Sequence, residues 1–287
     1  MDATHEIFSD EFKALWEPQA PVRQLWGALE TFHEGLCEMA VAKATALFQS
    51  TTMQELQEEI EAQRRPMEDI YVDWVNLLWT RIVLRTQLKV RDSLKLLFYS
   101  CNTANTYGCA LASRAILEHV ALLQYLASRV PWRSSRLVKK EDLMQFTTDL
   151  HQLAFGSRLD WERFLSGTVS LRQLLNSGVW SRPSNERIPA IGDLIGVLDD
   201  TLSALGRLEA KGQIQFVYSV LCDVVHPSWG GDFAYSPRMY RDMNAAGKLD
   251  AHFKLLATLF CLPIVEVVRH LVVLCDQLSK DEVRIIA

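Results

Sequence analysis

The stretch from Asn102 to Arg129 constrains the fold more than any other part of the chain. Between Gly108 and Ala127 almost every residue is apolar or small. The exceptions are Ser113, Arg114, Glu118, His119 and Gln124. A helix that is hydrophobic on nearly all sides belongs in the middle of a bundle rather than on its surface. The sequence therefore predicts a central helix at about 102–129, with the other helices packed around it.

Helical spacing of apolar residues continues through most of the remaining chain. It predicts helices over Pro21 to about Ser50, Met67 to Tyr99, Gln213 to Val225 and Lys248 to Ser279. No run alternates with a period of two between hairpin turns, as strands of a sheet would. The expected fold class is all-α, a multi-helix bundle around the central apolar helix with no significant β-sheet.

The break near residues 99–104 is the expected domain boundary. It separates an N-terminal helical region, residues 1–100, from a bundle core, residues 101–287. A chain of 287 residues can form one large helical domain or two smaller ones. The sequence leaves open whether the N-terminal region is continuous with the core.

Charge and cysteine content narrow the classes of function. With 30 Lys and Arg against 35 Asp and Glu, the net charge of −5 excludes a strongly cationic nucleic-acid binder but allows a local basic face. The six cysteines have no CxxC or other metal-binding spacing and are typical of core residues in a reducing compartment. The chain opens without a basic-then-apolar leader, and its longest apolar run, Leu255–Val265, is well short of the roughly 20 residues of a membrane span. We therefore expect a cytoplasmic protein with no membrane partner.

Two charges in the central helix are the first candidate functional residues. Arg114 precedes Glu118 by four residues, the weaker order for an intrahelical ion pair, so both are expected to find partners across the bundle as well. At about 100° per residue, Tyr107 and Tyr125 fall on the same stripe. Two interpretations stay open: a buried ion-pair network that fixes helix register, or the floor of a polar pocket in which Tyr107 contacts a ligand.

The second candidate segment is VYSVLCDVVHPS, residues 217–228. Pro227 disfavours helical geometry at His226, which places this imidazole at the C-terminal end of a helix. There it either serves only as a cap or takes part in a site. The following loop contains aromatic residues and paired glycines and suits a ligand lid. The expected ligand-binding residues, besides Tyr107, are Asp223, Ser228, Trp229 and Asp232.

These two segments resemble a family of mostly uncharacterised bacterial helical proteins that is placed near the HEPN superfamily. The similarity lies in Arg-x-x-x-Glu within SRAILEHVALLQYL and in Tyr-x7-His-Pro-Ser within YSVLCDVVHPS, and it covers about residues 95–280. Many HEPN proteins are RNases of toxin–antitoxin and antiphage systems. The resemblance implies a metal-independent endoribonuclease without a cofactor, with Arg114, Glu118, Tyr218 and His226 as its catalytic residues.

HEPN nucleases also share an Arg-x4-6-His motif, which Arg114 to His119 fits in spacing. The residue after the arginine is polar in those nucleases, however, and is Ala115 here. On a continuous helix Arg114 and His119 also point about 140° apart. We therefore predict that His226, rather than His119, is the functional companion of Arg114.

RNA cleavage by these residues needs a base, a cation and an acid. His226 is the expected base or acid, Arg114 the cation that stabilises the phosphorane, Glu118 the residue that orients Arg114, and Tyr107 or Tyr218 a donor. A basic face on the preceding helix, formed by Arg81, Arg85 and Lys89, is expected to hold the RNA backbone. The alternative for that face is an ordinary solvated helix surface.

Two hypotheses of function remain. The first is an HEPN-like, RNA-directed protein, an endoribonuclease if it is an enzyme, whose partners are RNA, a protein such as an antitoxin, and a second copy in a homodimer. The second is a non-catalytic helical protein whose Arg–Glu–His cluster is structural or binds a small anionic ligand. No metal is expected, because the chain has one Glu-x-x-His, Glu30 to His33, and a di-iron bundle needs two.

Overall fold

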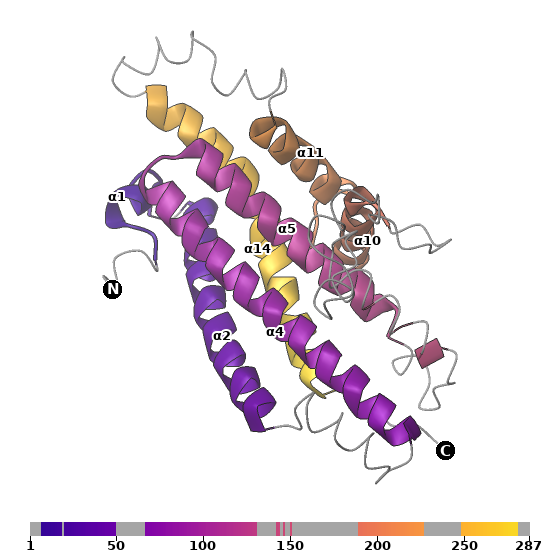
Figure 1. Ribbon diagram of the computed structural model, residues 1–287. Coiled ribbons are helices and arrows are strands. Elements are labelled where there is room, and N and C mark those ends of the chain that lie inside the picture. The colour runs from indigo at the N-terminus through magenta and orange to yellow at the C-terminus, as the bar shows by residue number, and fades with distance from the viewer. Residues whose placement is uncertain are drawn as a thin grey trace, which may run out of the picture. The chain divides into compact units, whose positions relative to one another are not determined.

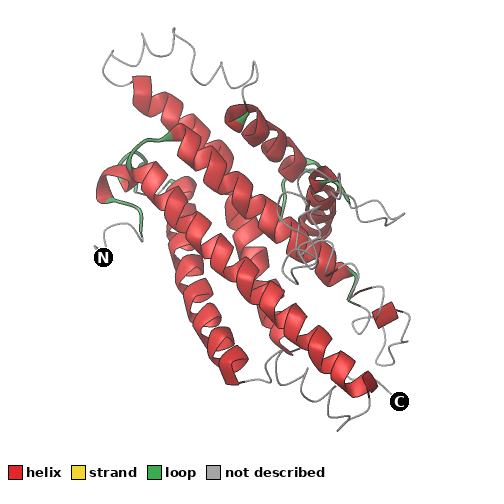
Figure 2. Cartoon of the chain, viewed as in Figure 1, coloured by secondary structure: helices red, strands yellow, loops and turns green. Residues whose placement is uncertain are grey.

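The computed structural model describes residues 7–18, 20–49, 67–130, 142–143, 146, 150, 189–226 and 248–280. All regular structure within these ranges is helical, and they contain no strand (Figure 2). The prediction of an all-α fold is therefore confirmed for the part of the chain that is described.

The described helices are labelled in Figure 1. They are α1 (Asp10–Lys13), α2 (Pro21–Gln49), α4 (Met67–Asn102), α5 (Thr106–Ser128), α10 (Ile191–Ala204), α11 (Gln213–Val225) and α14 (Lys248–Lys280). All of them belong to one compact unit, made of residues 1–128 and 191–283. Residues 129–190 and 284–287 form a second unit. The first unit thus contains helices from both sides of residue 100.

Helix α5 is the centre of the first unit, as its apolar sequence predicts. It packs against α4, α14, α10 and α11 (Figure 1). Ile116, Leu117, Val120 and Leu123 are completely buried. The helix begins at Thr106 rather than near Asn102 because the side chain of Asn105 accepts a hydrogen bond from the backbone N–H of Gly108, 3.0 Å away, and so caps the first turn.

Helices α4 and α5 form a tight hairpin. Gly108 lies against Ser100, and a Cβ atom at Gly108 would stand 3.0 Å from the Cβ of Ser100, so a larger residue would push the two helices apart. Beside this contact the Sγ atoms of Cys101 and Cys109 are 3.6 Å apart and buried. The close approach fixes the register in which α5 packs on α4.

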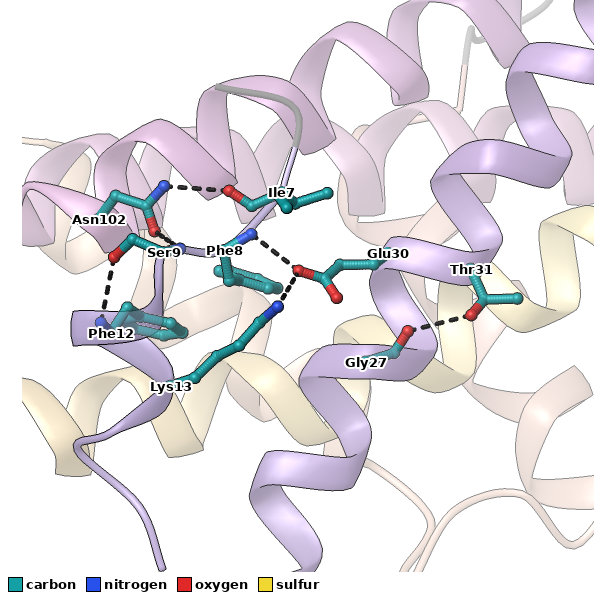
Figure 3. Close-up of polar contacts among 9 residues, drawn as sticks. All are labelled: Ile7, Phe8, Ser9, Phe12, Lys13, Gly27, Glu30, Thr31 and Asn102. Carbon is teal, nitrogen blue, oxygen red and sulfur yellow. Dashed lines mark hydrogen bonds and ion pairs between the residues drawn. The ribbon is translucent and has the colours of Figure 1, made fainter. Parts of the chain in front are cut away.

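The N-terminal segment bridges α2 and α4 (Figure 3). The amide of Asn102 donates to the carbonyl of Ile7 over 3.1 Å and accepts from the backbone N–H of Ser9 over 2.8 Å. Glu30 of α2 accepts from the backbone N–H of Phe8 and from Nζ of Lys13, both at 2.8 Å. The ring of Phe8 packs on aromatic side chains of both helices, namely Trp26 and Phe98. These contacts tie the end of α4, just before the hairpin turn, to α2.

Helix α11 takes its N-terminal cap from another helix. Gly212, with φ of 89°, precedes α11 and has no side chain to cap it. The carboxylate of Asp199 on α10 instead accepts from the backbone N–H groups of Gly212 and Ile214, at 2.6 and 2.7 Å. Asp199 is buried, so these charge-assisted bonds are sheltered from water. They fix where α11 begins, and with it the residues that α11 turns toward α5.

Helix α14 also packs on α5 and continues through Pro263. Buried His270 of α14 shares a hydrogen bond of 2.8 Å with Gln124 of α5. Among the described residues, no helix is both long enough and apolar enough to cross a membrane.

Candidate functional site

Arg114 and His226 meet, although 112 positions separate them in the sequence. Arg114 Nη1 lies 2.9 Å from Nε2 of His226, and its Nε donates to Oε1 of Glu118 over 2.8 Å. A guanidinium has only donors, so Nε2 of His226 must accept. The contact therefore requires a neutral imidazole with its proton on Nδ1. The expectation that Arg114 meets His226 is confirmed.

Tyr218 completes the cluster from α11. Its hydroxyl donates to Oε1 of Glu118 over 2.9 Å, the same oxygen that accepts from Arg114. The guanidinium also lies 5.8 Å from the centre of the Tyr218 ring, within the range of a cation–π contact. Both charges of the central helix thus have partners on α11, as predicted. One carboxylate oxygen holds the arginine and the phenol in place together.

The helical geometry of α11 explains why its residues face α5 together. Tyr218, Cys222 and His226 follow one another at intervals of four, on one face of the helix. The helix ends at Val225, and His226 has an extended backbone, with φ of −87° and ψ of 151°, as Pro227 predicts. Its own N–H still bonds to the carbonyl of Cys222 over 2.8 Å. His226 therefore serves both as a backbone cap and as a side chain of the cluster.

Cys222 is a member of the cluster that the sequence did not single out for this role. It hydrogen-bonds to Tyr218 and interacts electrostatically with Arg114. The only sequence signal was its place on the stripe that leads to His226, and cysteines in apolar helices are usually core residues.

The electrostatics of the cluster keep its groups in defined protonation states. Burial raises the pKa of Tyr218 well above its ordinary value, and the hydrogen bond and charge of Glu118 raise it further, so the phenol stays protonated. Burial opposes the charge of Arg114, but the hydrogen bond and charge of Glu118 outweigh that effect and raise its pKa. The site thus presents a permanent cation next to the imidazole of His226.

The cluster is open to water. The side chains of Arg114 and Glu118 are 21% and 31% exposed, and His226 is exposed. A purely structural network of charges is normally closed, with its donors and acceptors satisfied inside the protein. An approaching solute can therefore reach the guanidinium and the imidazole directly.

The structure describes only some of the other predicted ligand-binding residues. Tyr107 is exposed on α5, two turns before Arg114, and Asp223 is exposed on α11 beside Cys222. Ser228, Trp229 and Asp232 lie outside the described residues. The expected lid over the site therefore stays a prediction.

The predicted basic residues lie on α4. Arg81 and Lys89 are exposed, whereas Arg85 is partly buried and its pKa is lowered by that burial. His119 of α5 is turned toward this helix: its pKa is lowered first by burial and then by the charges of Lys89 and Arg85. Arg114 and His119 are thus directed to different neighbouring helices, in agreement with their angular separation.

The described part of the chain contains no cluster of three or more His, Cys, Asp or Glu residues that would suit a metal ion. His33, of the single Glu-x-x-His, is buried beside Cys37 and packs on the ring of Phe98. It is a histidine of the core.

No family model, curated protein or solved structure matches this chain. The similarity to the HEPN superfamily therefore stays a prediction.

Proposed function

We propose that the protein is an HEPN-like, metal-independent endoribonuclease in which Arg114 and His226 are the catalytic residues and Glu118 and Tyr218 position Arg114. One observation carries the proposal: the guanidinium of Arg114 lies 2.9 Å from Nε2 of His226, in a cluster that is open to solvent. A cation for the phosphate and a base for the 2′-hydroxyl are the two groups that metal-independent RNA cleavage needs at one place.

In the free protein, Arg114 donates a hydrogen bond to Nε2 of His226. The lone pair of this nitrogen is the one that His226 needs to act as a base. A phosphate diester is a stronger acceptor for a guanidinium than a neutral imidazole is, because it carries a charge. Binding of RNA therefore transfers the Nη1 hydrogen bond from His226 to a phosphate oxygen and leaves Nε2 free. Substrate binding and activation of the base are then the same event.

The reaction follows from this exchange. His226 takes the proton of the 2′-hydroxyl, the O2′–P bond forms, and Arg114 stabilises the negative charge of the phosphorane. The P–O5′ bond then breaks and the imidazolium gives its proton to O5′. The products are a 2′,3′-cyclic phosphate and a 5′-hydroxyl.

Glu118 and Tyr218 act through Arg114 in this proposal. The hydroxyl proton of Tyr218 is directed to Glu118, and its raised pKa makes it a poor acid. We therefore assign both residues a positioning role. The candidate RNA-binding residues Arg81, Arg85 and Lys89 hold the backbone beyond the cleavage site.

The biological setting of the proposal comes from the family resemblance alone. A ribonuclease of this kind belongs to a toxin or defence system in the cytoplasm. Its partners are RNA, a protein such as an antitoxin, and a second copy of the chain.

The test is an RNA cleavage assay with the purified protein in the presence of EDTA, with analysis of the product ends. We expect cyclic phosphate ends from the wild type, and a loss of at least about 100-fold in rate for His226→Gln. The matched variant is His119→Gln, which changes the other histidine of the Arg-x-x-x-x-His motif and should retain cleavage. Activity that disappears in His119→Gln but persists in His226→Gln would overturn the assignment.

A second function is favoured by the way the cluster cross-links α5 and α11. In a non-catalytic helical protein, the Arg–Glu–His cluster holds the two helices together or binds a small anion. That function predicts no cleavage by the wild type and a lower melting temperature for His226→Gln. Cleavage by the wild type and the melting temperature of His226→Gln therefore separate the two functions.

A further inference from the structure

An exposed apolar strip leads along α5 to the proposed catalytic arginine. Tyr107 and Leu111 lie within about 60° of Arg114 and Glu118 around the helix axis. Tyr107 is 43% exposed and Leu111 is 40% exposed. Most other large apolar residues described on α5 are buried, so this exposure is local to the strip. The apolar strip, Tyr107 and Leu111, begins about 11 Å from Arg114 along the helix and ends about 5 Å from it.

The nearest residue of the predicted basic face lies by a different face of α5. His119 follows Glu118 directly, and Lys89 of α4 is close enough to His119 for its charge to lower the pKa of that histidine. Lys89 is itself exposed. Along α5, an aromatic ring and a leucine therefore precede the Arg114–His226 pair on one face of the helix, whereas Lys89 lies near His119 on the face turned toward α4.

This order fits a nucleotide chain better than it fits an apolar segment of a protein. A nucleotide offers a flat base on one side and a phosphate on the other, and aromatic side chains bind bases by stacking on their faces. An apolar helix of a partner protein would place its hydrophobic residues against the partly exposed Arg114 and Glu118 and remove them from water without offering any further hydrogen bond.

We infer that Tyr107, supported by Leu111, stacks on the base next to the cleaved phosphate. The inference rests on the proposed function and adds a residue that selects the substrate. A base that stacks on a side chain must leave its own helix, so cleavage requires that this nucleotide be unpaired.

The test measures binding in a cleavage-deficient background, His226→Gln, by fluorescence anisotropy with a short labelled RNA. Tyr107→Ala should weaken binding about ten-fold, and Tyr107→Phe should leave it unchanged because the ring is retained. The matched control is Tyr99→Ala: Tyr99 is 45% exposed on α4, in the same hairpin, but lies outside the strip. It should bind as its parent does.

A second measurement separates stacking from a structural role of Tyr107. An RNA with an abasic nucleotide at the stacked position should bind about ten-fold more weakly to the parent, and Tyr107→Ala should then cause no further loss. Equal losses on intact and abasic RNA would overturn the inference. A blunt duplex of the same sequence should bind Tyr107→Ala and its parent equally.

The outcomes also separate this inference from the proposed function. If the wild type cleaves RNA and Tyr107→Ala binds and cleaves normally, the inference is wrong and the proposed function stands. If Tyr107→Ala changes the oligomeric state in light scattering but not RNA binding, the strip is a protein interface and the inference is again wrong. If the wild type neither binds nor cleaves RNA, both fail.

Discussion

His226 accepts a hydrogen bond from Arg114, so a permanent cation lies against the ring nitrogen that a general base would use. This relationship links protonation to structure. A proton on Nε2 would remove the acceptor and place two positive charges side by side. The contact between α5 and α11 at this point therefore exists only while His226 is neutral.

Substitutions of Arg114 distinguish the effect of its positive charge from the effect of its planar, multi-donor shape. Arg114→Lys keeps the cation but cannot donate to Glu118 and His226 at once through a planar fork. We expect little change in melting temperature and a large loss of RNA cleavage. Arg114→Ala should cost about 1 kcal/mol of unfolding free energy in urea titrations, because Glu118 keeps Tyr218 and is partly hydrated. Full cleavage by Arg114→Lys would show that the fork is not needed.

The cap on α11 gives a prediction about stability. Asp199→Ala removes the acceptor of two backbone N–H groups, the buried one of Ile214 and the partly buried one of Gly212, and we expect it to lower the unfolding free energy by about 2–4 kcal/mol. The neighbouring Asp200 pairs with Lys211 at the surface, so Asp200→Ala should have little effect and is the matched control. Equal urea midpoints for the two variants would contradict the proposed role of Asp199.

The raised pKa of Tyr218 predicts how the stability of the protein changes at alkaline pH. Its pKa is raised in the folded state, so its contribution to stability is complete below the ordinary tyrosine pKa of about 10 and is lost as pH rises through the folded value. Ultraviolet titration of the seven tyrosines should show one that ionises later than the others. Tyr218→Phe should remove that late step. A late step that persists in the variant would assign it to another tyrosine.

The lowered pKa of His119 predicts that stability changes with pH in the opposite direction at acidic pH. Its pKa is lowered by burial and by Lys89 and Arg85, so its contribution to stability is present above the ordinary histidine pKa of about 6.5 and is lost as pH falls through the folded value. Lys89→Gln should raise the pKa of His119, as measured by NMR titration of its ring protons. Glu118→Gln should lower it, because the carboxylate favours the charged ring. If the pKa of His119 shifts in neither variant, the charges of Lys89 and Glu118 must lie farther from its ring than in this structure.

Local patterns predicted much of this fold. The apolar sequence around Ile116 and Val120 placed α5 at the centre, and the bounds Gln213–Val225 of α11 agree with the structure. Pro227 predicted the extended backbone of His226, since that effect depends only on adjacent residues. The 140° angle between Arg114 and His119 was enough to favour the more distant histidine.

What the sequence did not reveal depends on contacts between distant residues. Asp199 sits in an ordinary helical pattern, and nothing near it indicates that it caps a helix beginning at Gln213. Asn102 likewise reads as a helix-ending residue, although its amide binds the backbone of Ile7 and Ser9. The sequence could not show that Cys222 belongs to the cluster, because this depends on how α11 is rotated about its own axis. The packing of α10, α5 and α11 determines that rotation.

The bridge made by the N-terminal segment has a consequence for any shortened form of the protein. A chain that starts at Pro21 would leave the amide of Asn102 without its two backbone partners and the ring of Phe98 without Phe8. The end of α4 would then fray toward the turn from which α5 starts. Removal of the first twenty residues would thus loosen the hairpin of α4 and α5, whose second helix carries Arg114. Every residue of the cluster would nevertheless still be present in the sequence.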